Sequence, residues 1–338
     1  MATQTERTVV YCAAVVQGIA LVTFPAASTI LTDPAEYDLS SSQYGVLFLP
    51  QVVTAIAAAL LGAGLSGRFG TKRVYLVGLA ASLVSMALLL VSAALTANES
   101  LAYGLLLLAT ASLGAGFGFT VPALNTLTAA FNPTAVNRSI LVLNALLGLG
   151  TVLAPVFVAI FDGLGFWWGL PLTAAALLVV LIVASVGLPL QTGARAAAAS
   201  AKRLEIPRRF WVYSGFAVLY GICETVNGNW AQLDMTSELG ASTTAAAFAL
   251  TAFWAMVTVG RVVFAAVQRI VPARLTYLCS RSCSRACSSS SPASRRTSRH
   301  SASSPSAWPA SGARRSSRSR SASARRSSLP FRPRLPAA

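Results

Sequence analysis

The sequence predicts an all-α membrane protein, with a six-helix N-terminal bundle, the first two helices of a second bundle, and a disordered tail. The chain has 338 residues, of which 55% are apolar and 11% charged. A soluble domain carries about 25% charged residues. Eight stretches are long and apolar enough to cross a bilayer, which takes about 20 residues. Basic residues are confined to alternate connections between these stretches, as expected when cytoplasmic loops carry the positive charge.

The eight predicted spans follow one another closely along the first 264 residues. They cover residues 9–31, 43–64, 73–95, 101–122, 139–161, 166–188, 210–231 and 243–264. The first is too long for the apolar region of a signal peptide, and seven more spans follow it. We therefore expect a multi-pass protein.

The connections assign an orientation to these spans. If the N-terminus is cytoplasmic, the cytoplasmic side contains Arg7, Arg68, Lys72, Arg73, Arg138, the basic residues of the 191–208 segment, Arg209, Arg269 and Arg274. The opposite connections contain Asp33, Glu36, Asp38, Glu99, Asp162, Asp234 and Glu238, and no Lys or Arg. This asymmetry predicts that both termini are cytoplasmic. We expect the protein to lie in the plasma (inner) membrane.

The chain divides into four predicted regions. Residues 1–190 form a six-helix unit, 191–208 a cytoplasmic linker, 209–278 a partial second unit, and 279–338 a tail. A weak internal repeat supports two related units, because Asp38-Leu39-Ser40-Ser41-Ser42 and Glu238-Leu239-Gly240-Ala241-Ser242 precede corresponding spans at an offset of 200. Serine in either segment could cap the helix that follows.

A glycine-rich segment connects the second and third spans. Gly62, Gly64 and Gly67 match the G-x-G-x-x-G pattern of dinucleotide sites. That pattern requires a strand before it and the N-terminus of a soluble helix after it. Here the segment closes one membrane span and opens the next, so we reject a dinucleotide site.

The same loop resembles the cytoplasmic signature loop of the major facilitator superfamily. The matching residues are Leu65, Arg68, Gly70, Lys72 and Arg73. Ala63 and Gly67 depart from it, standing where the family usually has Gly and Asp. The resemblance covers about residues 1–278, with a fainter similarity to sugar–proton symporters. It implies transport of a small solute by alternating access, coupled to protons, in a family that normally has twelve spans. In the alternative interpretation, the basic loop only fixes the orientation of the neighbouring spans in the membrane.

Glu224 is the only acidic residue inside a predicted span. It lies about 22 Å from the cytoplasmic face at 1.5 Å per residue. A charge there costs at least ~2.5–3.5 kcal/mol, so the carboxyl should face a cavity or be protonated. Three roles stay open: proton or substrate coupling, a structural hydrogen-bond anchor, or an interfacial position. Asn227 lies near the same helix face at i+3.

Uncharged polar residues in other spans extend this candidate path. They are Gln17, Gln51, Asn125 and Asn144. Each could line a solute path or bond a neighbouring helix. We expect Arg261 to lie too far down the opposite-running helix to pair with Glu224, and to extend its side chain toward the cytoplasmic surface.

The sequence predicts no enzyme, cofactor or metal site. His300 is the only histidine and lies in the tail without an acidic partner, whereas acid–base catalysis usually needs such a pair. Cys279, Cys283 and Cys287 do not have a common metal-ligand spacing.

The tail carries 21 Ser and 13 Arg in residues 279–338, with no Lys, Asp or Glu. Binding to RNA, binding to anionic lipid and out-of-frame translation are the three interpretations. We favour a frameshift near codons 275–280, because TCN serine and CGN arginine codons shifted by one base encode apolar and uncharged residues.

The expected partners are a small solute, a proton and the lipid bilayer, with no nucleic acid. As written, we expect an inactive fragment of a transporter. The alternative is a non-transport eight-span membrane protein with a lipid- or RNA-binding basic tail.

Overall fold

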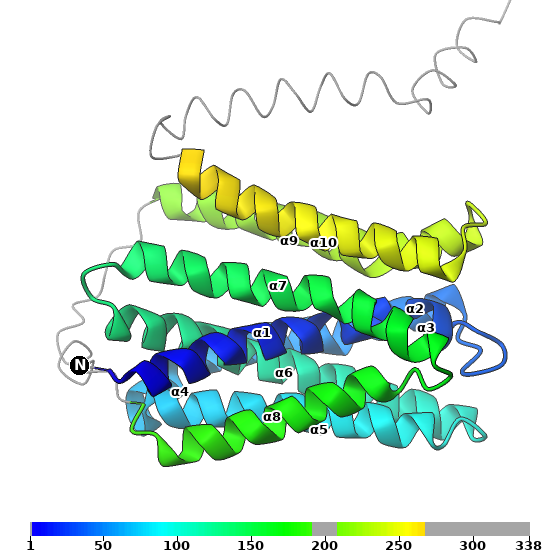
Figure 1. Cartoon of the computed structure of the whole chain (residues 1–338), viewed down its shortest axis with the longest axis horizontal. Helices are drawn as coiled ribbons and strands as arrows, with labels where there is room; N and C mark the ends of the chain where they lie inside the picture. Colours follow the sequence, from blue (N-terminus) through cyan, green and yellow to red (C-terminus); the bar gives the residue numbers. More distant parts are fainter. Residues whose placement is uncertain (1, 191–207, 268–338) are drawn as a thin grey trace, which may run out of the picture. The chain divides into compact units, whose positions relative to one another are not determined.

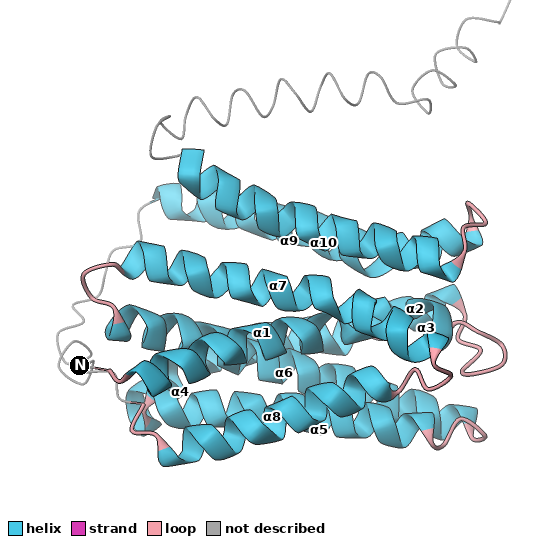
Figure 2. Cartoon of the chain, in the orientation of Figure 1, coloured by secondary structure: helices cyan, strands magenta, loops and turns pink. Residues whose placement is uncertain are grey.

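The computed structural model describes residues 2–190 and 208–267 (Figure 1). In these ranges every regular element is an α-helix, and no strand occurs (Figure 2). The helices are α1 (Gln4–Ala26), α2 (Ser28–Leu31), α3 (Ser41–Val46), α4 (Phe48–Phe69), α5 (Thr71–Ala93), α6 (Glu99–Phe131), α7 (Val136–Gly163), α8 (Gly169–Gly187), α9 (Arg208–Ser237) and α10 (Thr243–Val267). The all-α prediction is confirmed. The tail 279–338, with its three cysteines and His300, lies outside the described residues, as does the linker up to residue 207.

A helix occupies each of the eight predicted spans. Two spans consist of two helices joined by a single residue: Ala27 separates α1 from α2, and Leu47 separates α3 from α4. The α1–α2 junction follows Pro25, whose ring removes a backbone donor from the last turn of α1.

Helix α6 continues nine residues beyond the predicted end at residue 122, to Phe131. Pro122 lies inside the helix. Proline is tolerated in membrane helices where neighbouring helices compensate for the lost backbone bond. Leu124, Leu127 and Phe131 are buried, so packing stabilises the extra turns.

Seven helical segments of the described chain are long and apolar enough to cross a membrane. Helix α9 is not among them, although it has 30 residues. Its second half carries Glu224, Asn227, Asn229, Gln232 and Asp234, which lower its mean hydropathy. The spanning assignment of α9 therefore stays a prediction, and α9 is the most polar candidate.

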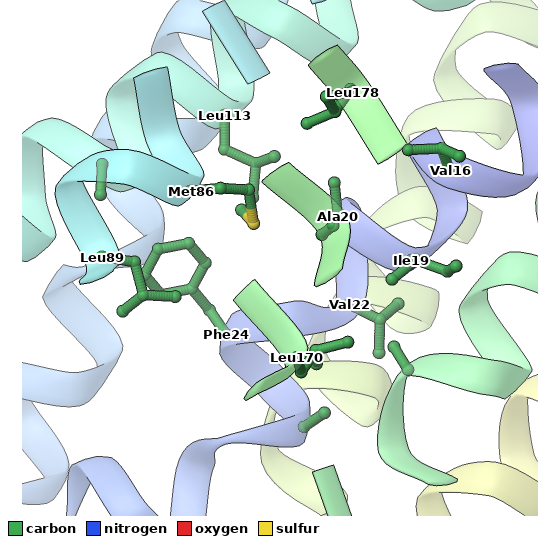
Figure 3. Packing of buried hydrophobic residues seen from close by; sticks show 14 of the residues in the cluster. Val16, Ile19, Ala20, Val22, Phe24, Met86, Leu89, Leu113, Leu170 and Leu178 are labelled. Carbon is green, nitrogen blue, oxygen red and sulfur yellow. The ribbon is translucent and has the colours of Figure 1, made fainter. Parts of the chain in front are cut away.

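The apolar core lies among the helices of the first unit (Figure 3). Phe24 of α1, Met86 and Leu89 of α5, and Leu113 of α6 are fully buried. Leu170 and Leu178 complete the core from α8. Long apolar side chains thus fill the space between α1, α5, α6 and α8.

Glycines permit that close approach. Gly114 and Gly118 of α6 both face α4, where a Cβ would collide with the carbonyl oxygens of Gln51 and Ala55 respectively. These two glycines, four residues apart, therefore lie on one packing face of α6. Small residues allow membrane helices to pack backbone against backbone.

The two serine-containing turns have the same local design. The side chain of Ser40 accepts from the amide of Gln43, and that of Ser242 accepts from the amide of Ala245, each at 3.2 Å. Two residues earlier, Asp38 and Gly240 have positive φ angles of 48° and 63°. The structural correspondence is therefore an offset of 202, two residues from the offset that the sequence suggested.

Helices α9 and α10 pack against the first unit. The hydroxyl of Tyr44 donates to the carbonyl oxygen of Asn229 at 2.9 Å, and the Tyr44 ring meets Trp230 edge-on at 5.4 Å. Helix α10 packs on α7, which runs in the opposite direction (Figure 1). These contacts place the polar half of α9 beside the first unit.

Candidate functional site

Glu224 and Arg261 form an ion pair. Nη2 of Arg261 lies 2.5 Å from Oε1 of Glu224, and their side chains are 39% and 17% exposed. The expectation that Arg261 lies too far along α10 to reach Glu224 is wrong. Its guanidinium extends to the carboxylate of α9 and not to the cytoplasmic surface.

The direction of side chains on helices explains this pairing. Every Cα–Cβ bond in a helix tilts toward the N-terminus of that helix. Because α9 and α10 run in opposite directions, Glu224 leans toward the cytoplasmic end while Arg261 leans away from it. The two tilts converge, and the long arginine stem spans the remaining separation. Counting residues along the axis alone, without these tilts, overestimated the distance.

The ion pair lies beside the contact between α10 and α7. A Cβ on Gly148 of α7 would collide with Oγ1 of Thr258, so these two positions face each other. One turn toward the cytoplasmic end, Asn144 shares the Gly148 face of α7 and Arg261 shares the Thr258 face of α10. Because the helices are antiparallel, Asn144 and Arg261 come to about the same depth.

Gln17 is fully buried in α1. Its Oε1 accepts a hydrogen bond from the hydroxyl of Ser82 of α5 at 3.3 Å. Its Nε2 has no partner among the described residues. A buried donor without an acceptor is costly, so this amide is suited to bind a water or solute oxygen.

The three asparagines bond to their own helices. The side-chain amides of Asn125, Asn144 and Asn227 donate to the carbonyl oxygens of Val121, Ile140 and Cys223, at 3.0, 2.9 and 2.8 Å. Asn125 and Asn144 are partly buried, and Asn227 is exposed. The amide oxygens remain available as acceptors. The structure gives no direct contact that joins these asparagines, Gln17 and Glu224 into one cluster.

A cavity of about 370 Å³ opens beside the second half of α9. Its lining comes from the start of α3 and from α9: Ser41, Val226, Asn227, Trp230, Ala231, Leu233, Asp234, Ser237 and Glu238. Asn227 was a predicted path residue, whereas Trp230 and Asp234 were not. The polar stripe of α9 was the signal that could have identified them, since a membrane helix rarely carries so many polar residues without an aqueous or protein neighbour.

The signature loop joins α4 to α5 through Gly70, whose φ of 90° and ψ of 147° suit glycine alone. Lys72 donates from Nζ to the carbonyl oxygens of Val186 and Leu188, at 2.8 and 2.6 Å. These groups end α8, where a cation is favourable. Leu65 is half-buried, while Arg68 and Arg73 are exposed. The loop therefore contributes a helix cap as well as charge.

On the same side of the protein, Arg7 donates from Nη2 to the carbonyl oxygen of Phe131 at 3.1 Å, at the end of α6. Two predicted cytoplasmic cations thus hold helix ends. Among the residues that the structure describes, no group of three His, Cys, Asp or Glu side chains could hold a metal ion.

Comparison with protein families matches residues 9–280 to the Major Facilitator Superfamily. Comparison with curated proteins finds no matching sequence. The matched range contains every described helix from residue 9 onward, including the signature loop and the ion pair. Members of this family are membrane transporters, not enzymes, and carry small solutes. The chain is a multi-pass membrane protein that belongs to the Major Facilitator Superfamily.

Proposed function

We propose that this protein transports a small solute by alternating access and couples the movement to protons, with Glu224 as the proton-binding group. The ion pair between Glu224 of α9 and Arg261 of α10 supports the proposal most directly. It holds a carboxylate, the group that would bind the proton, between two helices of a membrane protein. Uptake of a proton by Glu224 would remove the charge compensation of Arg261. An unpaired charge in a membrane interior is unfavourable, so protonation would change the preferred state of the α9–α10 pair.

The path proposed for the solute passes between two units. The six-helix unit, residues 1–190, supplies Gln17, Asn125 and Asn144, while α9 supplies Glu224 and Asn227. Transporters built from repeats bind their substrates at such an interface, near the middle of the membrane. The unpaired Nε2 of Gln17 and the shared depth of Asn144 and Arg261 support this path.

We also propose that the protein lies in the plasma (inner) membrane with both termini cytoplasmic. The basic residues of the described loops support this orientation, since Arg7, Arg68, Lys72, Arg73 and Arg138 all fall on one side. An accessibility test with single cysteines at exposed loop positions would check it. Labelling at residue 69 only after permeabilisation, and at residue 164 in intact cells, is the expected result.

The transport test starts from the gene. Resequencing codons 270–338 and beyond decides which C-terminal sequence is expressed. If a second frame encodes further apolar spans, the longer product is assayed beside the chain described here. The proposal requires solute uptake from at least one of the expressed products.

The assay uses proteoliposomes with an imposed pH gradient, and a fluorescent dye reports proton entry when a solute is added. The expected result for Glu224→Gln is loss of proton-coupled uptake with unchanged membrane insertion. Glu99→Gln is the matched control, because Glu99 is exposed at the start of α6. Glu224→Asp tests whether a shorter carboxylate restores coupling. Unchanged uptake in a well-inserted Glu224→Gln protein would exclude Glu224 as the coupling group.

A further inference from the structure

Arg261 has binding capacity that Glu224 does not use. A guanidinium carries five N–H donors in a planar fork that fits a carboxylate with two parallel bonds. In the described part of the chain, Arg261 makes one hydrogen bond, from Nη2 to Oε1 of Glu224. Its side chain is 39% exposed, against 17% for Glu224. The arginine is therefore the member of the pair that an incoming ligand can reach.

Charge balance determines which ligand suits this site. The ion pair is neutral overall. A proton on Glu224 would leave Arg261 as an unpaired cation, and an anion bound to the intact pair would leave a net negative charge. Binding one proton and one monoanion together restores neutrality, so each should promote the binding of the other.

We infer that the substrate is a small organic anion bearing a carboxylate, which binds Arg261 in place of Glu224 when Glu224 takes up a proton. The inference rests on the proposed function, and it specifies the substrate class of the same site. The proton comes from solution and stays on Glu224, and the substrate carboxylate accepts the N–H groups that Glu224 releases. No covalent bond forms or breaks.

Neighbouring groups fit such a ligand. Asn144 reaches about the depth of Arg261 on the facing side of α7, and its amide oxygen could accept from a hydroxyl group of the substrate. A small hydroxy acid, which supplies both a carboxylate for Arg261 and a hydroxyl for Asn144, therefore matches these two groups.

The test measures binding and proton uptake with the full chain purified into liposomes. The probes are radiolabelled lactate and benzoate, compared with their neutral amides. We expect tighter binding of the anions at acidic than at alkaline pH, with one proton taken up per anion. Weak or equal binding of the amides is expected at every pH. Equal affinity for anions and amides would overturn the inference.

Two variants separate the roles of the pair. Arg261→Gln should weaken lactate binding on the order of a hundredfold, as expected for loss of a charge-assisted contact. Glu224→Gln should bind lactate independently of pH and without proton uptake, because glutamine resembles the protonated acid. Arg68→Gln is the control, since Arg68 is exposed in the signature loop. Retained binding in a folded Arg261→Gln protein contradicts the inference.

The substrate class and the transport function can fail separately. Proton-linked lactate binding without uptake by any product of the gene would support the substrate class and reject the proposed transport. Proton-coupled uptake of a neutral solute that requires Glu224 but survives Arg261→Gln would support transport and reject the anion.

Discussion

Gly150 of α7 faces Val15 of α1 so closely that a Cβ at position 150 would collide with the Val15 carbonyl oxygen. Gly18 has the reciprocal contact, against the carbonyl oxygen of Leu147. Two helices of the first unit thus pack backbone against backbone over more than one turn. The α1–α7 contact is therefore sensitive to a single methyl group at either glycine.

We predict that Gly150→Ala destabilises the protein by about 1–3 kcal/mol, because overpacking forces the two helices apart. The melting temperature in a mild detergent measures the change. Gly104→Ala in α6 is the control, since a Cβ there would meet nothing within 4 Å. The control should be neutral or slightly stabilising, because alanine favours helix more than glycine does. Equal melting temperatures for Gly150→Ala and wild type would argue against the tight contact.

Lys72→Met should destabilise the end of α8 by about 1–2 kcal/mol, because it removes the two bonds to Val186 and Leu188. Hydrogen exchange of the last α8 turn should accelerate. Arg73→Met serves as the comparison, because Arg73 is exposed on the same helix turn. A similar exchange rate in both variants would mean that the Lys72 cap contributes nothing measurable.

Gly70→Ala should cost about 1–3 kcal/mol, since a backbone at φ 90° and ψ 147° is strained for any residue with a Cβ. Gly67→Ala, three residues earlier in α4, should be tolerated, because it has helical backbone and open space. Denaturant titration of both variants measures the difference. A larger loss of stability in Gly67→Ala than in Gly70→Ala would show that the backbone conformation at residue 70 does not require glycine.

Helices α9 and α10 should insert into the membrane as a pair. Without Arg261, the α9 carboxylate loses its partner and insertion becomes less favourable by about 2.5–3.5 kcal/mol. A glycosylation acceptor placed in the 238–242 turn reports insertion in microsomes. We expect reduced glycosylation in Arg261→Leu and recovery in the double variant Glu224→Leu/Arg261→Leu. Val262→Leu, which keeps the pair, should insert like wild type.

The positions of the helices could be predicted because membrane helices need long apolar segments, and those are visible in the sequence. The end of α6 could not, because Pro122 suggests a helix end while the burial of Leu127 and Phe131 stabilises the further turns up to residue 131. The polarity of α9 also limits the prediction of that span. Its length and position agree with the prediction, but its hydropathy is lower than that of the other spanning candidates.

The candidate site could be predicted only in part. Glu224 was identified because a carboxylate is rare in an apolar segment. Its partner was missed because helix rise gives the depth of a Cα atom, whereas an arginine side chain reaches several ångströms along the helix. The buried position of Gln17 and the exposed position of Asn227 depend on helix rotation within the bundle, which these spacings do not determine.

The paired turns before α3 and α10 have a consequence for the history of the gene. In each, a residue with positive φ precedes the capping serine by two positions, although one is Asp38 and the other Gly240. If one ancestral helix pair was duplicated, selection has kept the backbone conformation and the capping serine of the turn while its other residues diverged. Homologues should then carry Gly, Asn or Asp at positions 38 and 240 and exclude β-branched residues there. The shared origin of the two turns would then be visible in their dihedral angles after their sequence identity is lost.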